Sequence, residues 1–170
     1  MNLSQGMAKW MQEKGIVHAF GIIGGGNVVL FDAIAKLGAT QIVCCHHEQA
    51  AVMAASYYYR TCGKIAAALV TIGAGSANAI TGVIAAWMDS VPVLVISGNE
   101  STKDIGTKTR VWGVQGYGSI ELVKDVTKFA QRPALGMVIP TLDVAYEVAL
   151  APKQGPVWID IPKDKAGMEI

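Results

Sequence analysis

Short apolar segments and amphipathic segments alternate along almost the whole chain, and this alternation restricts the possible fold more than any other feature of the sequence. The short apolar segments predict buried strands, and the segments with apolar residues at helical spacing predict helices. Strict alternation of this kind predicts an α/β fold with a doubly wound, six-stranded parallel sheet and helices on both faces. The predicted strands are residues 17–22, 40–45, 64–73, 91–98, 127–133 and 155–162, and the predicted helices are residues 3–14, 28–38, 48–63 and 76–90, with two more starting near residues 119 and 141.

The size and charge of the chain narrow its functional class. With 170 residues, 52% of them hydrophobic, the chain is predicted to form one domain over residues 1–170. A net charge of +1 without a run of like charge gives no electrostatic basis for binding nucleic acid or an anionic membrane surface, and neither is expected as a partner. Because only 16% of the residues are charged, we expect another chain to cover apolar surface, although a tightly packed α/β core has a similar composition.

The segment "MNLSQGMAKWMQEKG" at the N-terminus is amphipathic and lacks the order of a signal peptide, in which a basic stretch precedes an apolar one. The most apolar windows, "IAAALVTIGAG" and "VPVLVISG", are shorter than a bilayer span. Cys44, Cys45 and Cys62 form an odd set in a chain without a predicted secretion signal, which favours reduced thiols over a disulfide framework. These features predict a cytoplasmic protein.

Five chemically versatile residues, "CCHHE", stand in a row at positions 44–48. Neighbouring side chains on a strand point to opposite faces, so the two cysteines and two histidines cannot all converge on one ion. The chain also has neither a CxxC pair nor two histidines four residues apart, and no metal site is predicted. We interpret Cys44 and Cys45 as small core residues at the end of a buried strand. His46 or His47 either orients a substrate or is only hydrogen-bonded at the strand end.

Glu48 lies where a predicted buried strand turns into the alanine-rich helix "EQAAVMAAS". A carboxylate in such apolar surroundings is costly unless it is paired or used. One interpretation is a helix N-terminal acid that stabilises free backbone donors. The other is an acid or base, because burial favours the protonated form and so prepares a carboxyl group for proton transfer.

Two glycine-rich turns follow predicted strands, in "GIIGGGN" and "TIGAGSAN". The first does not have the G-x-G-x-x-G spacing of a dinucleotide-binding loop, and the second does not have the G-x-x-x-x-G-K-[ST] pattern of a nucleoside triphosphate loop. Glycine at these places indicates close approach of the backbone to a ligand or to another chain. Residues 99–118 form a polar connection that is long for a compact domain, which is typical of a functional segment.

Four blocks of the sequence, in this order and at these separations, resemble one known family: "GIVHAFGIIGGGNVVLFDAIAK", "HHEQAAVMAASYYYRTCGK", "ALVTIGAGSANAITGVIAAWMDSVPVLVISG" and "GPVWIDIP". They are similar to the pyrimidine-binding domain of thiamine-diphosphate-dependent enzymes of the acetolactate synthase type, over residues 3–162. The resemblance implies that Glu48 hydrogen-bonds a ring nitrogen of the cofactor's aminopyrimidine and favours its imino tautomer, which deprotonates the thiazolium carbon. That carbon would then attack a 2-keto acid, with the cofactor carrying most of the chemistry.

The resemblance assigns further positions to the site. It implies that Gln115 approaches the substrate and that two glycine turns lie at the cofactor. This chain departs from the family at Ala74, where proline is common, and at Gly116, where an acid is frequent. Because of these departures, the resemblance does not predict which substrate is used. The residues that the resemblance assigns to cofactor binding are Gly24, Gly25, Gly26, Gly73, Gly75 and Asn78.

The family binds the diphosphate and magnesium through a G-D-G motif, which this sequence lacks. Thiamine diphosphate and magnesium are therefore expected to be held by a partner domain outside this chain, and the expected partners are further copies of the chain, a chain with a diphosphate-binding domain, or both. The favoured hypothesis is the pyrimidine-side half of a 2-keto-acid carboligase or decarboxylase. The alternatives are a non-catalytic interaction or regulatory module that pairs with a full-length relative, and an unrelated nucleotide-binding domain, which no phosphate loop supports.

Three aromatic or sulfur-containing side chains, those of Phe20, Trp87 and Met88, follow strand or helix patterns and are predicted to lie in the core. The consecutive tyrosines at 57–59 cannot share one face of a helix. At least one of them is therefore expected to reach the surface or a partner.

Overall fold

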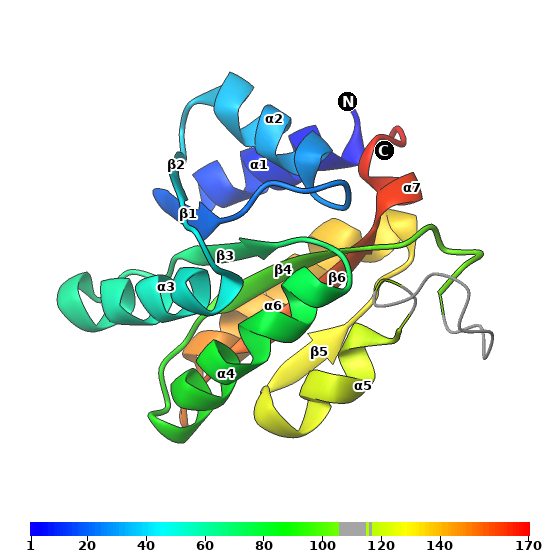
Figure 1. The fold of residues 1–170 in the computed structure, drawn as a ribbon. Coiled ribbons are helices and arrows are strands. Elements are labelled where there is room, and N and C mark those ends of the chain that lie inside the picture. Colours follow the sequence, from blue (N-terminus) through cyan, green and yellow to red (C-terminus); the bar gives the residue numbers. More distant parts are fainter. Residues whose placement is uncertain (106–114, 116) are drawn as a thin grey trace.

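The computed structural model describes residues 1–105, 115 and 117–170. Six strands form one parallel sheet in the order β2-β1-β3-β4-β6-β5 (Figure 1). The predicted class, number of strands and parallel arrangement are confirmed. The strands are β1 (His18–Gly21), β2 (Gln41–Cys44), β3 (Ala67–Val70), β4 (Leu94–Asn99), β5 (Phe129–Gln131) and β6 (Val157–Pro162).

Helices cover both faces of this sheet and create two separate cores. One core joins α1, α2 and α6 to one face, and the other joins α3, α4 and α5 to the opposite face. The described helices are α1 (Leu3–Glu13), α2 (Val28–Leu37), α3 (Glu48–Cys62), α4 (Ala74–Met88), α5 (Ser119–Val123), α6 (Val138–Leu150) and α7 (Lys163–Ala166), with short 3-10 turns η2 (Lys124–Val126) and η3 (Leu135–Met137).

Local sequence signals explain where several helices begin and end. Asn2 and Gln5 form a reciprocal capping box at the start of α1, with hydrogen bonds of 2.9 and 3.0 Å. Helices α2 and α3 end at Gly38 and Gly63, as predicted, and both glycines are left-handed with φ of 71° and 68°. Helix α6 starts at Val138, three residues before the predicted start, because a proline at position 140 is tolerated in the first turn of a helix.

Burial separates the central strands from the edge strands. Every residue of β3, β4 and β6 is buried, since helices cover both faces, and this accounts for their continuous apolar runs. The edge strand β2 has no buried residue. The prediction that Cys44 and Cys45 lie in the core is therefore wrong: Cys44 is exposed and Cys45 only partly buried.

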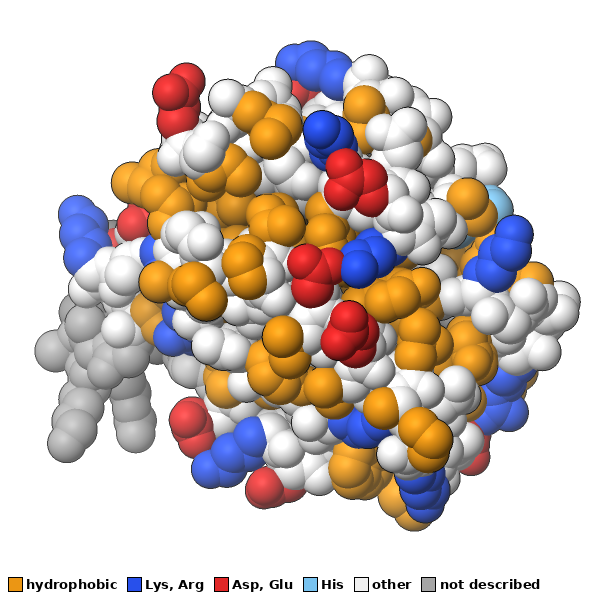
Figure 2. Space-filling model, turned by 180° about the vertical axis from the view of Figure 1, so that it is seen from behind, with side chains coloured by type: hydrophobic (Ala, Val, Ile, Leu, Met, Phe, Trp, Pro, Cys, Tyr) orange, Lys and Arg blue, Asp and Glu red, His pale blue; other side chains and the backbone are white. Residues whose placement is uncertain are grey.

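Two of the three predicted core residues lie at the surface instead. The exposed fractions are 37% for Trp87 and 73% for Met88, whereas Phe20 is partly buried against the core. Helix α4 turns Val83 and Ala86 inward, so Met88 comes out on the opposite side of the helix. Of the three consecutive tyrosines, Tyr57 is exposed, which confirms that prediction. On the face shown in Figure 2, hydrophobic side chains are interspersed with charged ones.

Candidate functional site

Three neighbouring strands end together at one edge of the sheet, and their carboxyl-terminal turns form the candidate site. Gly21 of β1 is in register with Cys44 of β2 on one side and with Leu69 of β3 on the other. The turns that follow these strands lead into α2, α3 and α4. Ligands of doubly wound folds bind at this edge, beyond the carboxyl ends of the strands.

Glu48 is the first residue of α3, and its side chain is buried at this edge, with 8% of the residue exposed. The Nδ2 of Asn78, from the second turn of α4, donates a hydrogen bond of 3.1 Å to Glu48 Oε2. His47 precedes Glu48 and caps α3 by accepting a hydrogen bond from the Gln49 N–H at Nδ1. The helix cap is therefore supplied by His47, which frees the Glu48 carboxyl group to turn toward α4.

The start of α4 lies directly against the Glu48 carboxyl group. A Cβ added at Gly75 would be 3.0 Å from Glu48 Oε1 and 2.8 Å from Thr71 Cγ2, so glycine is needed for the carboxyl group to occupy this position. Gly73 precedes the helix with φ of 64° and ψ of −113°, a backbone conformation that other residues rarely adopt. The structure thus brings Gly73, Gly75 and Asn78 together with Glu48.

The glycine turn after β1 packs against the same place. Gly24 N–H donates to Asn27 Oδ1 at 2.8 Å, and Gly26 N–H donates to Thr71 Oγ1 at 3.2 Å. A Cβ at Gly24 would overlap Thr71, and a Cβ at Gly26 would overlap Ile72. These two glycines are therefore required by close packing between the turns after β1 and β3.

Gly25 differs from its two neighbours. It is exposed, and a Cβ there would have no atom within 4 Å, so packing within the chain does not require glycine. Its assignment to cofactor binding stays a prediction.

Thr71 joins the two glycine turns, and the sequence reasoning missed it. Besides accepting from Gly26, it accepts a hydrogen bond at its carbonyl oxygen from Ser76 Oγ at 2.8 Å. Its place immediately after a buried strand was the signal that could have identified it.

Tyr117 is a second residue that the sequence reasoning missed. Its hydroxyl donates a hydrogen bond of 2.6 Å to the carbonyl oxygen of Gly73. Burial, with a further contribution from the negative charge of Asp160, raises the pKa of Tyr117 to about 12. The hydroxyl therefore remains a donor at neutral pH.

The described residues do not test the predicted role of Gln115. Gln115 is exposed and lies next to residues outside the described part of the chain, among them Gly116, which was noted as a departure from the family. A role for Gln115 near the substrate stays a prediction.

A second polar cluster is buried at the ends of β4 and β6. Asp160 accepts hydrogen bonds from Ser97 Oγ at 2.6 Å, Asn99 Nδ2 at 2.8 Å and Arg132 Nε at 2.6 Å. Trp158 Nε1 donates to Ser97 Oγ at 2.8 Å. With these partners, the buried Asp160 carboxylate is stabilised as part of the fold.

In the 44–48 segment, His46 and His47 are exposed. Within the described residues, no three cysteine, histidine or acidic side chains are placed to share an ion.

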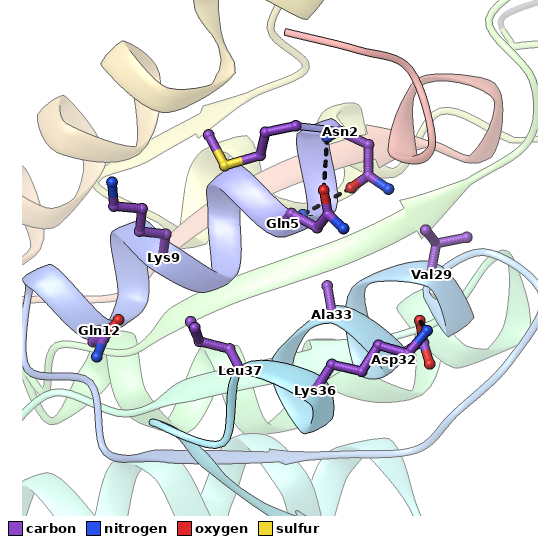
Figure 3. A pocket seen from close by; sticks show the side chains of 10 residues that line it. Asn2, Gln5, Lys9, Gln12, Val29, Asp32, Ala33, Lys36 and Leu37 are labelled. Carbon is purple, nitrogen blue, oxygen red and sulfur yellow. Dashed lines mark hydrogen bonds and ion pairs between the residues drawn. The ribbon is translucent and has the colours of Figure 1, made fainter.

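A surface groove of about 440 Å³ lies elsewhere, between α1 and α2 (Figure 3). Its two lysines pair with acids on their own helices, Lys36 with Asp32 at 2.7 Å and Lys9 with Glu13 at 3.9 Å. The groove is on the other face of the sheet from α3 and α4 and does not include Glu48.

The doubly wound fold and the buried Glu48 beside two glycine turns agree with the family found by comparison with known proteins. The chain belongs to the thiamine pyrophosphate enzyme family: residues 1–126 match the family described as "Thiamine pyrophosphate enzyme, N-terminal TPP binding domain". The resemblance noted in the sequence is confirmed.

Curated relatives of this chain are acetolactate synthase large subunits. The identity is 37% over 155 residues with the protein of Haemophilus influenzae, 33% over 168 residues with that of Lactococcus lactis, and 35% over 153 residues with isozyme 3 of Escherichia coli. These matches cover 91%, 98% and 89% of the chain, but only 26%, 28% and 26% of the respective relatives. The chain therefore spans little more than a quarter of the length of these relatives.

In the part of the chain that the structure describes, no helix is both long and apolar enough to cross a bilayer.

Proposed function

We propose that this chain is the pyrimidine-side half of a thiamine-diphosphate-dependent 2-keto-acid carboligase or decarboxylase of the acetolactate synthase type. The observation that carries the proposal is the buried Glu48 carboxyl group, held by Asn78 and seated over Gly75 where three strands end. In this proposal the chain acts as a single domain over residues 1–170.

The residues at this edge fit the aminopyrimidine of the cofactor. Asn78 occupies Glu48 Oε2, and no described residue donates a hydrogen bond to Oε1, which leaves Oε1 for a ring nitrogen. A Cβ at Gly75 would lie 3.0 Å from Glu48 Oε1, so this glycine keeps side-chain atoms away from the oxygen that would face the ring. When bound, thiamine diphosphate supplies the nucleophilic carbon and the electron sink for 2-keto-acid chemistry.

The proposed task of Glu48 is to hold and transfer one proton at Oε1. Asn78 fixes the orientation of the carboxyl group through Oε2, and burial limits competition from water. The glycine turns position the ring against Oε1, and Gln115 would approach the substrate side. The chain's contribution is thus a positioned acid and the glycine turns beside it, whereas magnesium and the diphosphate would be held by a partner domain.

The exposed apolar side chains of α3 and α4 suit the association that this proposal requires. Tyr57, Ile84 and Met88 are exposed, by 65%, 43% and 73%. Aromatic residues and methionine are enriched in protein interfaces. We therefore propose that further copies of this chain, a chain with a diphosphate-binding domain, or both cover this face.

The test is calorimetric titration of thiamine diphosphate and magnesium into the purified chain, alone and mixed with a chain that carries the diphosphate-binding motif. Binding and 2-keto-acid decarboxylation should appear in the mixture. Glu48→Gln should abolish decarboxylation, because the amide cannot transfer the proton. The matched control is Glu13→Gln, which changes an exposed acid on α1 and should leave decarboxylation unchanged.

The alternative is a non-catalytic interaction or regulatory module that pairs with a full-length relative. The same exposed side chains on α3 and α4 favour it, since they suit a protein partner whether or not Glu48 acts. Stable association without turnover, insensitive to Glu48→Gln, would support this alternative and contradict the catalytic proposal.

A further inference from the structure

Tyr117, near the end of the 99–118 connection, forms a hydrogen bond with the turn before α4. Its hydroxyl lies 2.6 Å from the Gly73 carbonyl oxygen, which also accepts a hydrogen bond of 2.9 Å from the Ala77 N–H. Two donors on one carbonyl fix the orientation of that peptide group. The Tyr117 hydroxyl therefore restrains the peptide bond at which α4 begins.

This restraint adds to the hydrogen bond of 2.8 Å from Ser76 Oγ to the Thr71 carbonyl oxygen, which also holds the start of α4. Gly73 and Gly75 have no side chains to pack, and glycine loses more conformational freedom on folding than any other residue. In the same short segment, a Cβ added at Gly75 would lie 3.0 Å from Glu48 Oε1, and Asn78 donates a hydrogen bond to Oε2 at 3.1 Å. A small displacement of the turn would shift both contacts of the Glu48 carboxyl group.

We propose that Tyr117 is a positioning residue that holds the N-terminal turn of α4 and thereby sets the position of the Glu48 carboxyl group. Its significance for catalysis rests on the function proposed above. Tyr117 also anchors the segment that contains Gln115, since two residues of chain span at most about 7 Å. One hydrogen bond thus ties the proposed substrate side of the site to the turn on which Glu48 depends.

The chain offers a matched control for this proposal. The Tyr59 hydroxyl also has a hydrogen-bond partner, accepting from Gln154 Nε2 at 2.8 Å. Tyr59 lies near the C-terminal end of α3, whereas Glu48 is at its N-terminal end. Tyr59→Phe removes a hydroxyl of the same kind without touching the turn before α4.

The experiment compares Tyr117→Phe with Tyr59→Phe by NMR of the purified chain. In Tyr117→Phe the Asn78 side-chain amide signals and the Glu48 carboxyl carbon signal should shift, and in Tyr59→Phe both should keep their wild-type positions. Unchanged signals in Tyr117→Phe, or equal shifts in the two variants, would overturn the proposal. If Tyr117→Phe does not fold, the contact is tested in the labelled wild-type chain. The proposal requires cross peaks between the Tyr117 ring and the Gly73–Ala77 amides, and their absence would overturn it.

A second comparison measures thiamine diphosphate binding in the mixture with the diphosphate-binding chain. Loss of one neutral hydrogen bond corresponds to a rise of roughly two- to tenfold in the dissociation constant. This rise is expected for Tyr117→Phe and not for Tyr59→Phe, and equal affinities would contradict the proposal. If the wild-type mixture binds no cofactor, the proposed function fails, and the NMR comparison still decides the role of Tyr117.

Discussion

Gly75→Ala tests whether the turn before α4 is shaped for the Glu48 carboxyl group. The new Cβ would lie 2.8 Å from Thr71 Cγ2 and 3.0 Å from Glu48 Oε1, both closer than ordinary van der Waals contact. Thr71 cannot move freely, because its hydroxyl and its carbonyl are both hydrogen-bonded. The start of α4 therefore has to shift away from Thr71, and the Glu48 carboxyl group has to give way at Oε1.

Two opposing effects set the expected stability. Alanine is favoured over glycine in a helix by about 1 kcal/mol. Overpacking of a tight contact costs roughly 1–3 kcal/mol. The free energy of unfolding should therefore fall by no more than about 2 kcal/mol, as measured by urea denaturation. Because the new methyl group occupies space beside Oε1, thiamine diphosphate affinity in the mixture should fall at least about tenfold, the equivalent of 1.4 kcal/mol.

Gly82→Ala is the matched control in the same helix. Its Cβ would meet Val52 Cβ at 2.7 Å and the Gln49 carbonyl oxygen at 3.1 Å, so it strains the packing of α4 on α3 away from the Glu48 carboxyl group. This variant should lose stability without a comparable loss of cofactor affinity in the folded fraction. The reasoning is refuted if Gly75→Ala binds thiamine diphosphate as the wild type does, or if affinity falls in step with stability in both variants.

Three further results are expected from stability measurements. Gly98→Ala should lower the free energy of unfolding by about 2–3 kcal/mol in urea, because a Cβ there would overlap the backbone of Gly26. The hydrogen bond from Lys14 lowers the pKa of Asp143, so this pair stabilises the fold above the ordinary aspartate pKa and stops doing so on acidification. The variant Asp143→Asn should therefore show a smaller loss of stability at acidic pH than the wild type. The pKa of Tyr117 is raised to about 12 from 10.0, so its contribution is complete below pH 10 and should be lost as the pH rises to 12, unlike in Tyr117→Phe.

The alternation of apolar and amphipathic segments was sufficient to predict the sheet, because parallel strands covered on both faces must be apolar throughout. It located the central strands β3, β4 and β6 well, since all their residues are buried. It failed for Cys44 because a strand at the edge of a sheet need not be buried, and strand order is not encoded in local sequence. It failed for Met88 because the direction of the inward face of α4 depends on the tertiary contacts of Val83 and Ala86.

In the candidate site, too, residues marked by a local sequence pattern could be predicted, and residues that act through distant contacts could not. Glu48 could be found from the sequence because an acid at the end of an apolar strand is conspicuous, and its burial is confirmed. Thr71 and Tyr117 could not be found in this way, because each acts through a contact between segments far apart in the chain. The Tyr117 hydroxyl reaches Gly73 across 44 residues, and no local pattern predicts that pair.

The hydrogen bond from Tyr117 suggests a physical reason why alanine, instead of the proline common in the family, can stand at position 74. Ala74 is the first residue of α4, where proline is favoured because its φ is fixed and the N–H at this position has no partner within the helix. Alanine gives up that restraint, and the bond from Tyr117 to the Gly73 carbonyl supplies another at the adjacent residue. Gly73 can precede proline without strain, since its ψ of −113° lies outside the α region that proline disfavours.

Ala74→Pro should therefore restore the Asn78 and Glu48 NMR signals of Tyr117→Phe toward their wild-type positions. If Ala74→Pro shifts these signals equally in the wild-type and Tyr117→Phe backgrounds, the two restraints are independent, and the turn is not held in the way proposed.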